Sequence, residues 1–295
     1  MNLTSGFPAH AVTNIFHPTD FSPESEVAFA HALKLAVATN SALRIMHVEP
    51  QASDDAWQNF PKVRATLTRW GVPLPEETAT SGLHINKILT YREDPAASIL
   101  QELKGNPADL IVLTTYQHDG LDRFFGKPVA EPVARESRSR TLFIPAGTPG
   151  FVGIEDGAAQ LRRILIPIAR TPNPQAAVEA AAALTFALGE RHAAFRLLHI
   201  GNEAEMPLVN PPVHEGWTWE TSVRSGDVVE QILEFQSEFA ADLIVMSSEG
   251  HQGFLDTLLG STTEQVIRGA RCAVFVIPVD PLREGEGTLP PGLGI

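Results

Sequence analysis

The most constraining feature of this sequence is an internal repeat. The segment Ala108–Val112, which reads Ala-Asp-Leu-Ile-Val, recurs unchanged at Ala241–Val245, 133 positions later (241 − 108 = 133). Self-similarity on this scale predicts two tandem copies of one domain. The register continues without a gap, and further identical pairs are His118 and His251, Gly120 and Gly253, Glu131 and Glu264, Val133 and Val266, Arg135 and Arg268, and Pro145 and Pro278.

Length and composition narrow the class of protein. A chain of 295 residues is long enough for two cores of ordinary size, and 43% hydrophobic with 19% charged residues is typical of a soluble globular protein. The net charge of −13 disfavours a general nucleic-acid binder, although a nucleotide held by backbone amides needs no cation. The single cysteine, Cys272, fits a reducing compartment. With neither a signal peptide nor a membrane span recognised, we expect a cytoplasmic protein.

The first copy alternates strands with helices. Ser22-Pro23 is typical of a helix start, with serine as the N-cap and proline at the first helical position. The pattern predicts strands at Asn14–Pro18, Ala42–Val48, Leu83–Tyr91, Asp109–Leu113 and Thr141–Ile144, and helices at Pro23–Ala38, Ala56–Trp70, Pro95–Leu103 and Val129–Glu136.

The second copy follows the same order. Thr171-Pro172 repeats the helix start of the first copy, and we expect that helix to run to Leu188. The pattern further predicts strands at Ile164–Ile166, Phe195–Ile200, Thr218–Val223, Leu243–Met246 and Val274–Ile277, and helices at Val228–Phe239 and Thr263–Gly269.

Strands that alternate with helices predict a parallel sheet with helices on both faces. In such sheets a ligand binds beyond the carboxyl ends of the strands, where the strand order reverses. The fifth strands, Thr141–Ile144 and Val274–Ile277, are apolar and have no following strand in their own copy. An uncovered apolar edge promotes aggregation, so we predict that these two strands pair and form an intramolecular pseudo-dimer across the linker 146–160. The sequence leaves open whether two such chains also form a homodimer.

The two copies differ in the middle. Val48–Asp94 is long enough for a helix that the matching stretch, Ile200–Asp227, cannot hold. The shorter stretch contains Met206–His214, which reads as an extended loop. A lost helix is the simpler interpretation; the alternative is a loop that covers a pocket or packs on a partner.

The strongest chemical signal is the run Ser247-Ser248-Glu249-Gly250, followed by Gly260-Ser261-Thr262 at the start of a predicted helix. Glycine allows the backbone to approach a phosphate closely, and the free amides of a helix N-terminus favour an anion. Ser261 and Thr262 add hydroxyl donors. The residues alone equally allow an ordinary turn at Gly250 and an ordinary N-cap at Ser261.

These segments resemble the universal stress protein family. The resemblance rests on residues 18–22 after the first strand, on His47-Val48 at the end of the second, and on residues 250–262. It covers about residues 13–146 and 162–279 and points to the tandem members of the family. It implies two flavodoxin- or Rossmann-like domains, each a five-stranded parallel sheet with helices on both faces, at 10–147 and 160–280. From its composition, rich in Gly, Pro and Glu, we expect a disordered tail at 281–295.

The nucleotide-binding members of the family carry glycine, two residues, glycine, nine residues, then Gly-Ser or Gly-Thr. Gly250 and Gly260-Ser261 match the second part of this motif, whereas serine, Ser247, replaces its first glycine. In the first copy Gln117 and Lys127-Pro128 replace the matching residues. The resemblance also implies an aspartate that contacts the nucleoside at the end of the first strand; Asp20 provides it in the first copy and Ala169 replaces it in the second (169 − 20 = 149).

We therefore expect ATP or a related adenine nucleotide in the second copy, with the first copy degenerate. The expected nucleotide-binding residues are Pro167, Ile200, Ser247, Ser248, Gly250, Gly260, Ser261 and Thr262, together with Asp20 of the first copy. The expected function is a conformational switch that acts on an unidentified protein partner, without catalysis, metal, nucleic acid or membrane. The first alternative is a stress scaffold that binds no nucleotide, and the second is a weak ATPase.

Other side chains give weaker signals. His118 and His251 flank the phosphate loop and either donate to an anion or only pack there. His47 and His199 end equivalent strands, where we expect a structural role. Cys272 lies beside a buried strand, and we expect its thiol to be inert.

Overall fold

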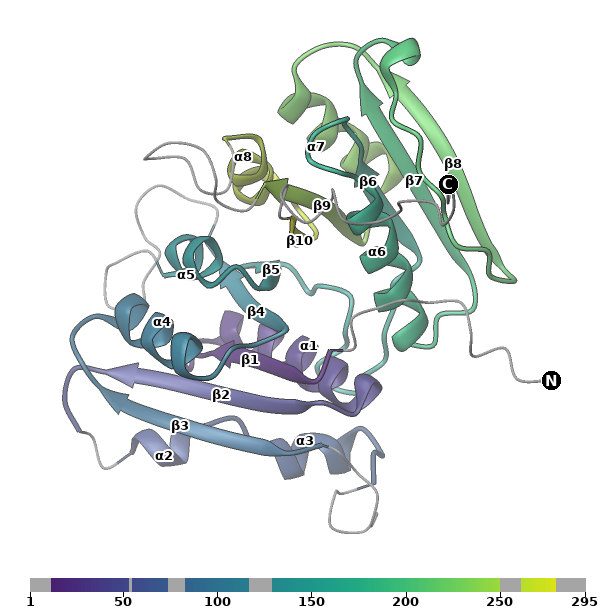
Figure 1. Ribbon diagram of the computed structural model, residues 1–295. Coiled ribbons are helices and arrows are strands. Elements are labelled where there is room, and N and C mark those ends of the chain that lie inside the picture. The colour runs from purple at the N-terminus through teal and green to yellow at the C-terminus, as the bar shows by residue number, and fades with distance from the viewer. Residues whose placement is uncertain (1–11, 53–54, 74–82, 117–128, 250–260, 280–295) are drawn as a thin grey trace, which may run out of the picture.

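The computed structural model describes residues 12–52, 55–73, 83–116, 129–249 and 261–279. Ten strands form one continuous sheet in the order β3-β2-β1-β4-β5-β10-β9-β6-β7-β8 (Figure 1). The first half contains β1 to β5 and the second half β6 to β10, and strands are parallel within each half. The α/β fold with two tandem five-stranded parallel sheets is as the sequence predicts.

The described elements follow the predicted alternation in both halves. The first half comprises β1 (Asn14–Pro18), α1 (Pro23–Thr39), β2 (Ala42–Glu49), α2 (Ala56–Asn59), α3 (Val63–Arg69), β3 (Ile85–Tyr91), α4 (Pro95–Gly105), β4 (Leu110–Thr115), α5 (Ala130–Ser137) and β5 (Arg140–Pro145). The second comprises β6 (Arg163–Pro167), α6 (Gln175–Ala187), β7 (Ala193–Ile200), the 3-10 turn η2 (Glu203–Glu205), β8 (Trp217–Arg224), α7 (Val228–Phe239), β9 (Leu243–Glu249), α8 (Ser261–Gly269) and β10 (Ala273–Val279).

Two apolar cores cover the two faces of the sheet. One core packs α1, α3 and α6 against the sheet, and the other packs α4, α5, α7 and α8 against the opposite face. Successive strand residues alternate between them: Leu243 and Val245 face the first core, and Ile244 and Met246 face the second. Because both faces are covered, these strands are apolar throughout.

The fifth strands join the halves. β5 and β10 pair antiparallel, with Phe143 opposite Val274 and Leu142 opposite Phe275. Phe143 and Val274 are fully buried. This confirms the pairing predicted from the apolar edges. Neither strand is left as an exposed edge, so the pairing removes the aggregation liability of both.

The aspartate of the repeated segment ties two strand starts together in each half. Asp109 accepts hydrogen bonds at Oδ2 from the backbone N–H groups of Thr13 and Asn14, at 2.8 and 2.9 Å. Asp242 accepts from Arg162 and Arg163 in the same way, at 2.9 and 2.8 Å. The hydrogen bonds to Asp109 help to hold its pKa below the usual range for a carboxyl group, against the effect of its partial burial. The repeat therefore preserves a structural anchor.

Two helix predictions were wrong. The expected helix Ala56–Trp70 is interrupted at Phe60, which is extended at φ −56° and ψ 142°, because the following Pro61 disfavours a helical conformation before it. The expected start at Thr171-Pro172 shifts to Gln175, whose N–H donates to Asn173 Oδ1 at 2.9 Å. Pro174 disfavours a helical Asn173 for the same reason.

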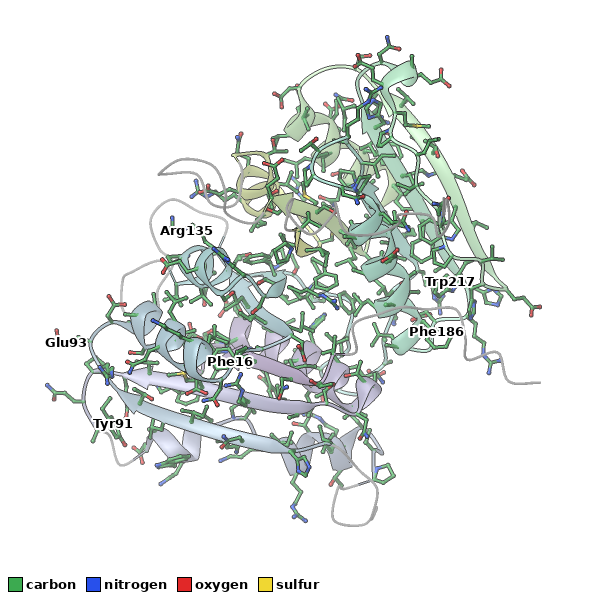
Figure 2. The ribbon with its side chains drawn as sticks, viewed as in Figure 1. Phe16, Tyr91, Glu93, Arg135, Phe186 and Trp217 are labelled. Carbon is green, nitrogen blue, oxygen red and sulfur yellow. The ribbon has the colours of Figure 1, made fainter. Side chains whose placement is uncertain are left out.

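The loop Met206–His214 takes the place of the missing helix. Met206 packs against the core that contains α6, and Asn210 exchanges two hydrogen bonds with the Gln175 side chain, at 2.8 and 3.1 Å. His214 contacts Phe186 of α6 and stacks on Trp217 of β8, at 5.8 and 4.4 Å between ring centroids. Figure 2 labels Phe186 and Trp217. These contacts hold the loop against α6 and β8.

The linker is packed against α1. His31 is fully buried, and its Nε2 accepts from the backbone N–H groups of Phe151 and Val152, at 2.9 and 3.2 Å. Its Nδ1 donates to the carbonyl oxygen of Val27 at 2.8 Å. Gly150 has a positive φ of 63°, and a Cβ there would collide with the His31 ring. Buried His31 is therefore one of the points at which the linker docks on the first half.

Candidate functional site

The strand order reverses between β1 and β4 in the first half, and between β6 and β9 in the second. The carboxyl ends of these strand pairs are the two candidate sites. Of the predicted residues, Pro167 ends β6, Ile200 ends β7, Ser247 and Ser248 lie near the end of β9, and Thr262 is in the first turn of α8. The parallel register brings the ends of β6, β7 and β9 to one edge of the sheet.

Part of the predicted phosphate loop lies outside the described residues. Gly250 and Gly260 fall in this category, as do His118 and His251 beside the loop. Ser261 is the first residue of α8, and its backbone is described. The prediction for these residues therefore stays a prediction, and the site is built from the ends of the strands.

Ser247 joins the two sides of the second candidate site. Its Oγ donates to the carbonyl oxygen of Asn173 at 2.7 Å, which links β9 to the segment that leads into α6. In the first half Thr114 Oγ1 donates to the carbonyl oxygen of Glu24 at 3.3 Å. Ser247 lies 133 residues after Thr114, and Asn173 lies 149 residues after Glu24. The hydroxyl at the first motif position is thus a structural tether common to both halves.

A buried histidine ends the second strand of each half. His47 Nδ1 donates to the carbonyl oxygen of Thr19 at 2.7 Å, and His199 Nδ1 lies 3.2 Å from that of Ile168. Each contact fixes the chain that leaves the first strand of its half. Burial lowers the pKa of His47, against the opposing effects of its hydrogen bond and of nearby carboxylates. The geometry fits the structural role expected for this pair.

Aromatic rings cover the first candidate site. Phe21 follows β1 with a positive φ of 63° and stacks on His47, with ring centroids 3.9 Å apart at 25°. Phe60 meets Phe21 edge to face at 5.2 Å. A cavity of about 540 Å³ adjoins this stack and is lined in part by Phe21 and Phe60. The chain's own side chains therefore occupy the space above the ends of β1 and β2.

Asp20 is engaged inside the protein. Its Oδ1 accepts from the backbone N–H and the hydroxyl of Ser22, at 3.0 and 2.6 Å, and its Oδ2 accepts from the Tyr116 hydroxyl at 3.2 Å. Burial raises the pKa of Tyr116 to about 12, so the phenol stays protonated and can donate. Tyr116 was missed in the sequence; the available signal was a lone tyrosine directly after β4.

The equivalent positions of the second half carry different side chains. Ala169, Arg170 and Glu249 stand where the first half has Asp20, Phe21 and Tyr116, and all three are exposed. Arg170 Nε donates to the carbonyl oxygen of Glu205 at 3.0 Å. At these three positions, therefore, the second site carries no aromatic side chain. Arg170 brings a cation and Glu249 a carboxylate to this edge of the sheet, and neither was among the expected nucleotide-binding residues.

Other chemistry is limited in the described part of the chain. Within those ranges no group of three or more His, Cys, Asp or Glu side chains is arranged to hold a metal ion. Burial raises the pKa of the Cys272 thiol to about 12, which fits an inert cysteine. None of the helices in the described ranges is long and apolar enough to cross a membrane.

Comparison with known proteins agrees with this architecture. The sequence model of the universal stress protein family matches residues 12–145 and 213–278. Universal stress protein MJ0531 of Methanocaldococcus jannaschii is 42% identical over 57 residues, which is 19% of this chain and 34% of that protein. The match therefore spans about a third of the length of this curated relative.

Two solved structures share the fold over nearly the whole chain. A universal stress protein from Archaeoglobus fulgidus DSM 4304 has a TM-score of 0.55 at 18% identity, covering 90% of this chain and 98% of that one. PA1789 from Pseudomonas aeruginosa PAO1, a protein of unknown function, has a TM-score of 0.60 at 13% identity, covering 91% and 93%.

Proposed function

The chain belongs to the universal stress protein family, and from this we propose that its second half binds ATP or a related adenine nucleotide as a conformational switch. The proposed site lies at the carboxyl ends of β6, β7 and β9 and at the start of α8. The observation that carries the proposal is the difference between the two halves at this place in the fold.

The first difference concerns space. In the first half Phe21 stacks on His47, and Tyr116 donates to Asp20. In the second half Ala169 and Glu249 replace Asp20 and Tyr116, and both are exposed. A nucleoside at the first site would have to displace a packed ring and break a hydrogen bond to a carboxylate. A nucleoside at the second site would face neither of these two costs, so the second site is favoured over the first.

The second difference concerns the anion. Backbone N–H groups in the first turn of a helix have no partner within the helix, and they favour a phosphate. In the second half α8 begins at Ser261, directly after the glycine-containing segment, and Thr262 adds a hydroxyl. In the first half the matching residues are Lys127-Pro128, and proline has no N–H to offer.

Both a positively and a negatively charged side chain lie near the second site. The guanidinium of Arg170 favours a phosphate, and the carboxylate of Glu249 opposes one. The anchoring of a phosphate must therefore come mainly from backbone amides. This balance is also the observation that favours the alternative function, a scaffold without nucleotide. Ala169 supplies no carboxylate there, and Ser247 Oγ already donates to Asn173.

The switch follows from the Ser247 tether. A nucleotide bound beside the end of β9 would act on Ser247, and through Asn173 on the start of α6. α6 packs on β9 and β10 and contacts α1 of the first half. These contacts connect the proposed site to the first half, and we propose that a protein partner responds to this change.

Mass spectrometry of the denatured, purified protein tests the proposal, together with thermal shift on added ATP. We expect co-purified adenine nucleotide, or an ATP-dependent rise in the unfolding temperature, because a ligand that binds only the folded state stabilises it. Absence of both results would favour the scaffold. Release of inorganic phosphate from ATP, abolished by Gly250→Val, would instead favour the third function, a weak ATPase.

A further inference from the structure

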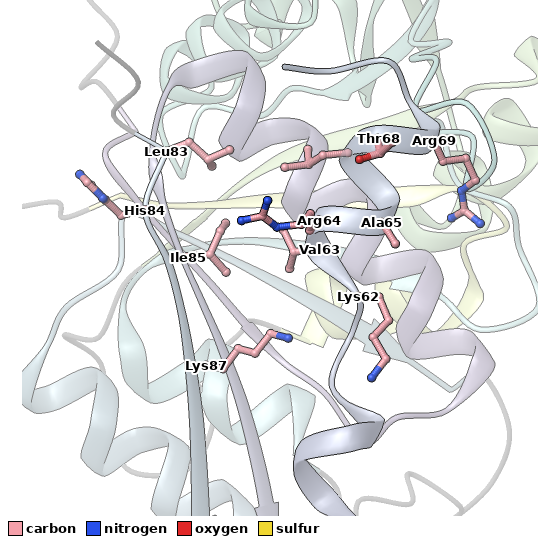
Figure 3. Close-up of a pocket in the computed structure, with 11 residues that line it drawn as sticks. Lys62, Val63, Arg64, Ala65, Thr68, Arg69, Leu83, His84, Ile85 and Lys87 are labelled. Atoms are coloured by element: carbon pink, nitrogen blue, oxygen red, sulfur yellow. The ribbon is translucent and has the colours of Figure 1, made fainter. Parts of the chain in front are cut away.

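The element that distinguishes the two halves also forms a pocket. α3 and the start of β3 enclose a cavity of about 1040 Å³ (Figure 3). The second half has no counterpart of α3, because the loop Met206–His214 occupies the equivalent stretch. The cavity shares Lys62, Ala65 and Arg69 with the smaller cavity beside the aromatic stack of the first half, and it belongs to the half that does not carry the proposed nucleotide site.

The walls of the pocket combine an apolar floor with a basic rim. Val63, Leu67 and Leu83 are buried and form the floor, and Ile85 beside them is half-buried. The ionisable side chains among the described lining residues are all basic: Lys62, Arg64, Arg69, His84 and Lys87. Among the described lining residues the charge is therefore positive, in a chain whose net charge is −13. This basic rim is complementary to an anion.

The two lysines are the strongest elements of the rim. Lys62, which directly precedes α3, and Lys87 of β3 both line the cavity (Figure 3), and Lys62 Nζ also donates to the carbonyl oxygen of Gln58. Lys87 Nζ also lies 5.6 Å from the centre of the Phe60 ring. Burial lowers the pKa of Lys87, and the positive charge of Lys62 lowers it further. An anion between the two ammonium groups would relieve this repulsion.

Arg69, on the same rim, is bound to the linker. It forms an ion pair with Glu155 at 3.4 Å and donates to the carbonyl oxygen of Ile154 at 3.1 Å. It therefore holds the linker against α3. Trp70 Nε1 donates to the same carbonyl at 2.9 Å, so the wall of the pocket is fixed to the linker at two points.

We propose that this pocket binds an amphiphilic anion of the fatty-acid type, with its carboxylate between Lys62 and Lys87 and its alkyl chain on the Val63–Leu67–Leu83 floor. The volume is at the upper end of the range for small-molecule sites. Inorganic anions would use only the rim and a neutral alkane only the floor, whereas an alkyl carboxylate uses both. This proposal is independent of the nucleotide site.

Calorimetry with free dodecanoate below its micellar concentration tests the proposal. We expect saturable binding to the full chain, and at least about tenfold weaker binding to the double variant Lys62→Gln/Lys87→Gln, because charge-assisted hydrogen bonds to the carboxylate are lost. Lys104→Gln is the matched control, since Lys104 is an exposed lysine of α4, which packs on the opposite face. It should bind dodecanoate like the wild type.

Further ligands separate the contributions of charge and chain. Dodecyltrimethylammonium has the same chain with a cation, and it should not bind. Equal binding of dodecanoate to the wild type and the double variant would overturn the proposal, as would no binding to the wild type. Competition by inorganic phosphate at equal concentration would overturn the role of the alkyl chain. Sedimentation with anionic vesicles but no binding of free dodecanoate would assign the pocket to a membrane surface and overturn the small-molecule site.

Discussion

The hydroxyl of Ser247 donates to the carbonyl oxygen of Asn173 at 2.7 Å and thereby ties the end of β9 to the start of α6. Thr114 and Glu24 form the equivalent contact in the first half at 3.3 Å. Ser247, which replaces the first glycine of the motif, therefore makes a structural contact of its own rather than only removing a contact to phosphate. It is a structural feature that both halves share.

Removal of this tether should destabilise the second half. We expect Ser247→Ala to lower the free energy of unfolding by about 1 kcal/mol, the usual net value of one hydrogen bond. Thr114→Val, which keeps the shape of the side chain, should cost less because its hydrogen bond is longer. Urea denaturation of the two variants measures this, and a neutral Ser247→Ala would show that the contact contributes nothing.

A carboxylate placed after β6 should strengthen nucleotide binding once its repulsive neighbour is removed. Asp20 in the first half accepts from Tyr116, but the residue equivalent to Tyr116 in the second half is Glu249. We expect Ala169→Asp/Glu249→Gln to bind ATP several-fold more tightly than Glu249→Gln alone, through one hydrogen bond of about 1 kcal/mol. Calorimetry of both variants tests this. Equal affinities would mean that the second site orients its ligand differently.

Stability should fall in mild acid because of two buried histidines. Burial lowers the pKa of His17 and of His31 to about 4, whereas in the unfolded chain both titrate near 6.5. The unfolded state therefore binds protons between these values. The stabilisation is fully present above pH 6.5 and is lost as the pH falls toward 4. We expect a loss of about 2 kcal/mol per histidine between pH 7.5 and 5, measured by urea denaturation.

The second half supplies the control for this effect. Ile166 stands where the first half has His17, and His17 Nε2 has no hydrogen-bond partner in the described part of the chain. His17→Ile should therefore remove the contribution of His17, about 2 kcal/mol between pH 7.5 and 5, without loss of folding at pH 7.5. An unchanged pH profile in this variant would assign the acid sensitivity to other groups.

The β5–β10 pair should hold the two halves together. Phe143 and Val276 are buried in this pair, so Phe143→Lys/Val276→Lys places two charges where no water reaches. Small-angle scattering should then give a larger radius of gyration, with helical circular dichroism retained. Thr218→Lys on the exposed edge strand β8 is the control and should leave the profile unchanged. An unaltered profile in the double variant would mean that the linker and α1–α6 contacts suffice.

Periodicity and the internal repeat predicted most of the fold, because both can be read from the sequence without knowing which distant segments touch. The strands, the order of elements and the β5–β10 pairing follow from apolar runs and from edges that must be covered. The break at Phe60 and the late start of α6 were missed although Pro61 and Pro174 are visible in the sequence. Their effect on the preceding residue was outweighed by a longer helical pattern.

The candidate site was less predictable, because its features depend on contacts between distant segments. Phe21 covers the first site only because it adopts a positive φ and meets His47 from another strand. The hydrogen bond from Tyr116 to Asp20 spans 96 residues of sequence. The repeat register identifies their counterparts, Arg170 and Glu249, once these contacts are known.

The most direct test of the account is calorimetry of ATP binding to the wild type, Gly250→Val and Gln117→Ala. These two variants change equivalent positions of the two halves, because 117 and 250 are 133 residues apart. A valine at position 250 places a branched side chain where the proposed phosphate must approach the backbone. The account predicts that Gly250→Val abolishes binding and that Gln117→Ala retains wild-type affinity. Loss of binding in Gln117→Ala with retention in Gly250→Val would contradict it.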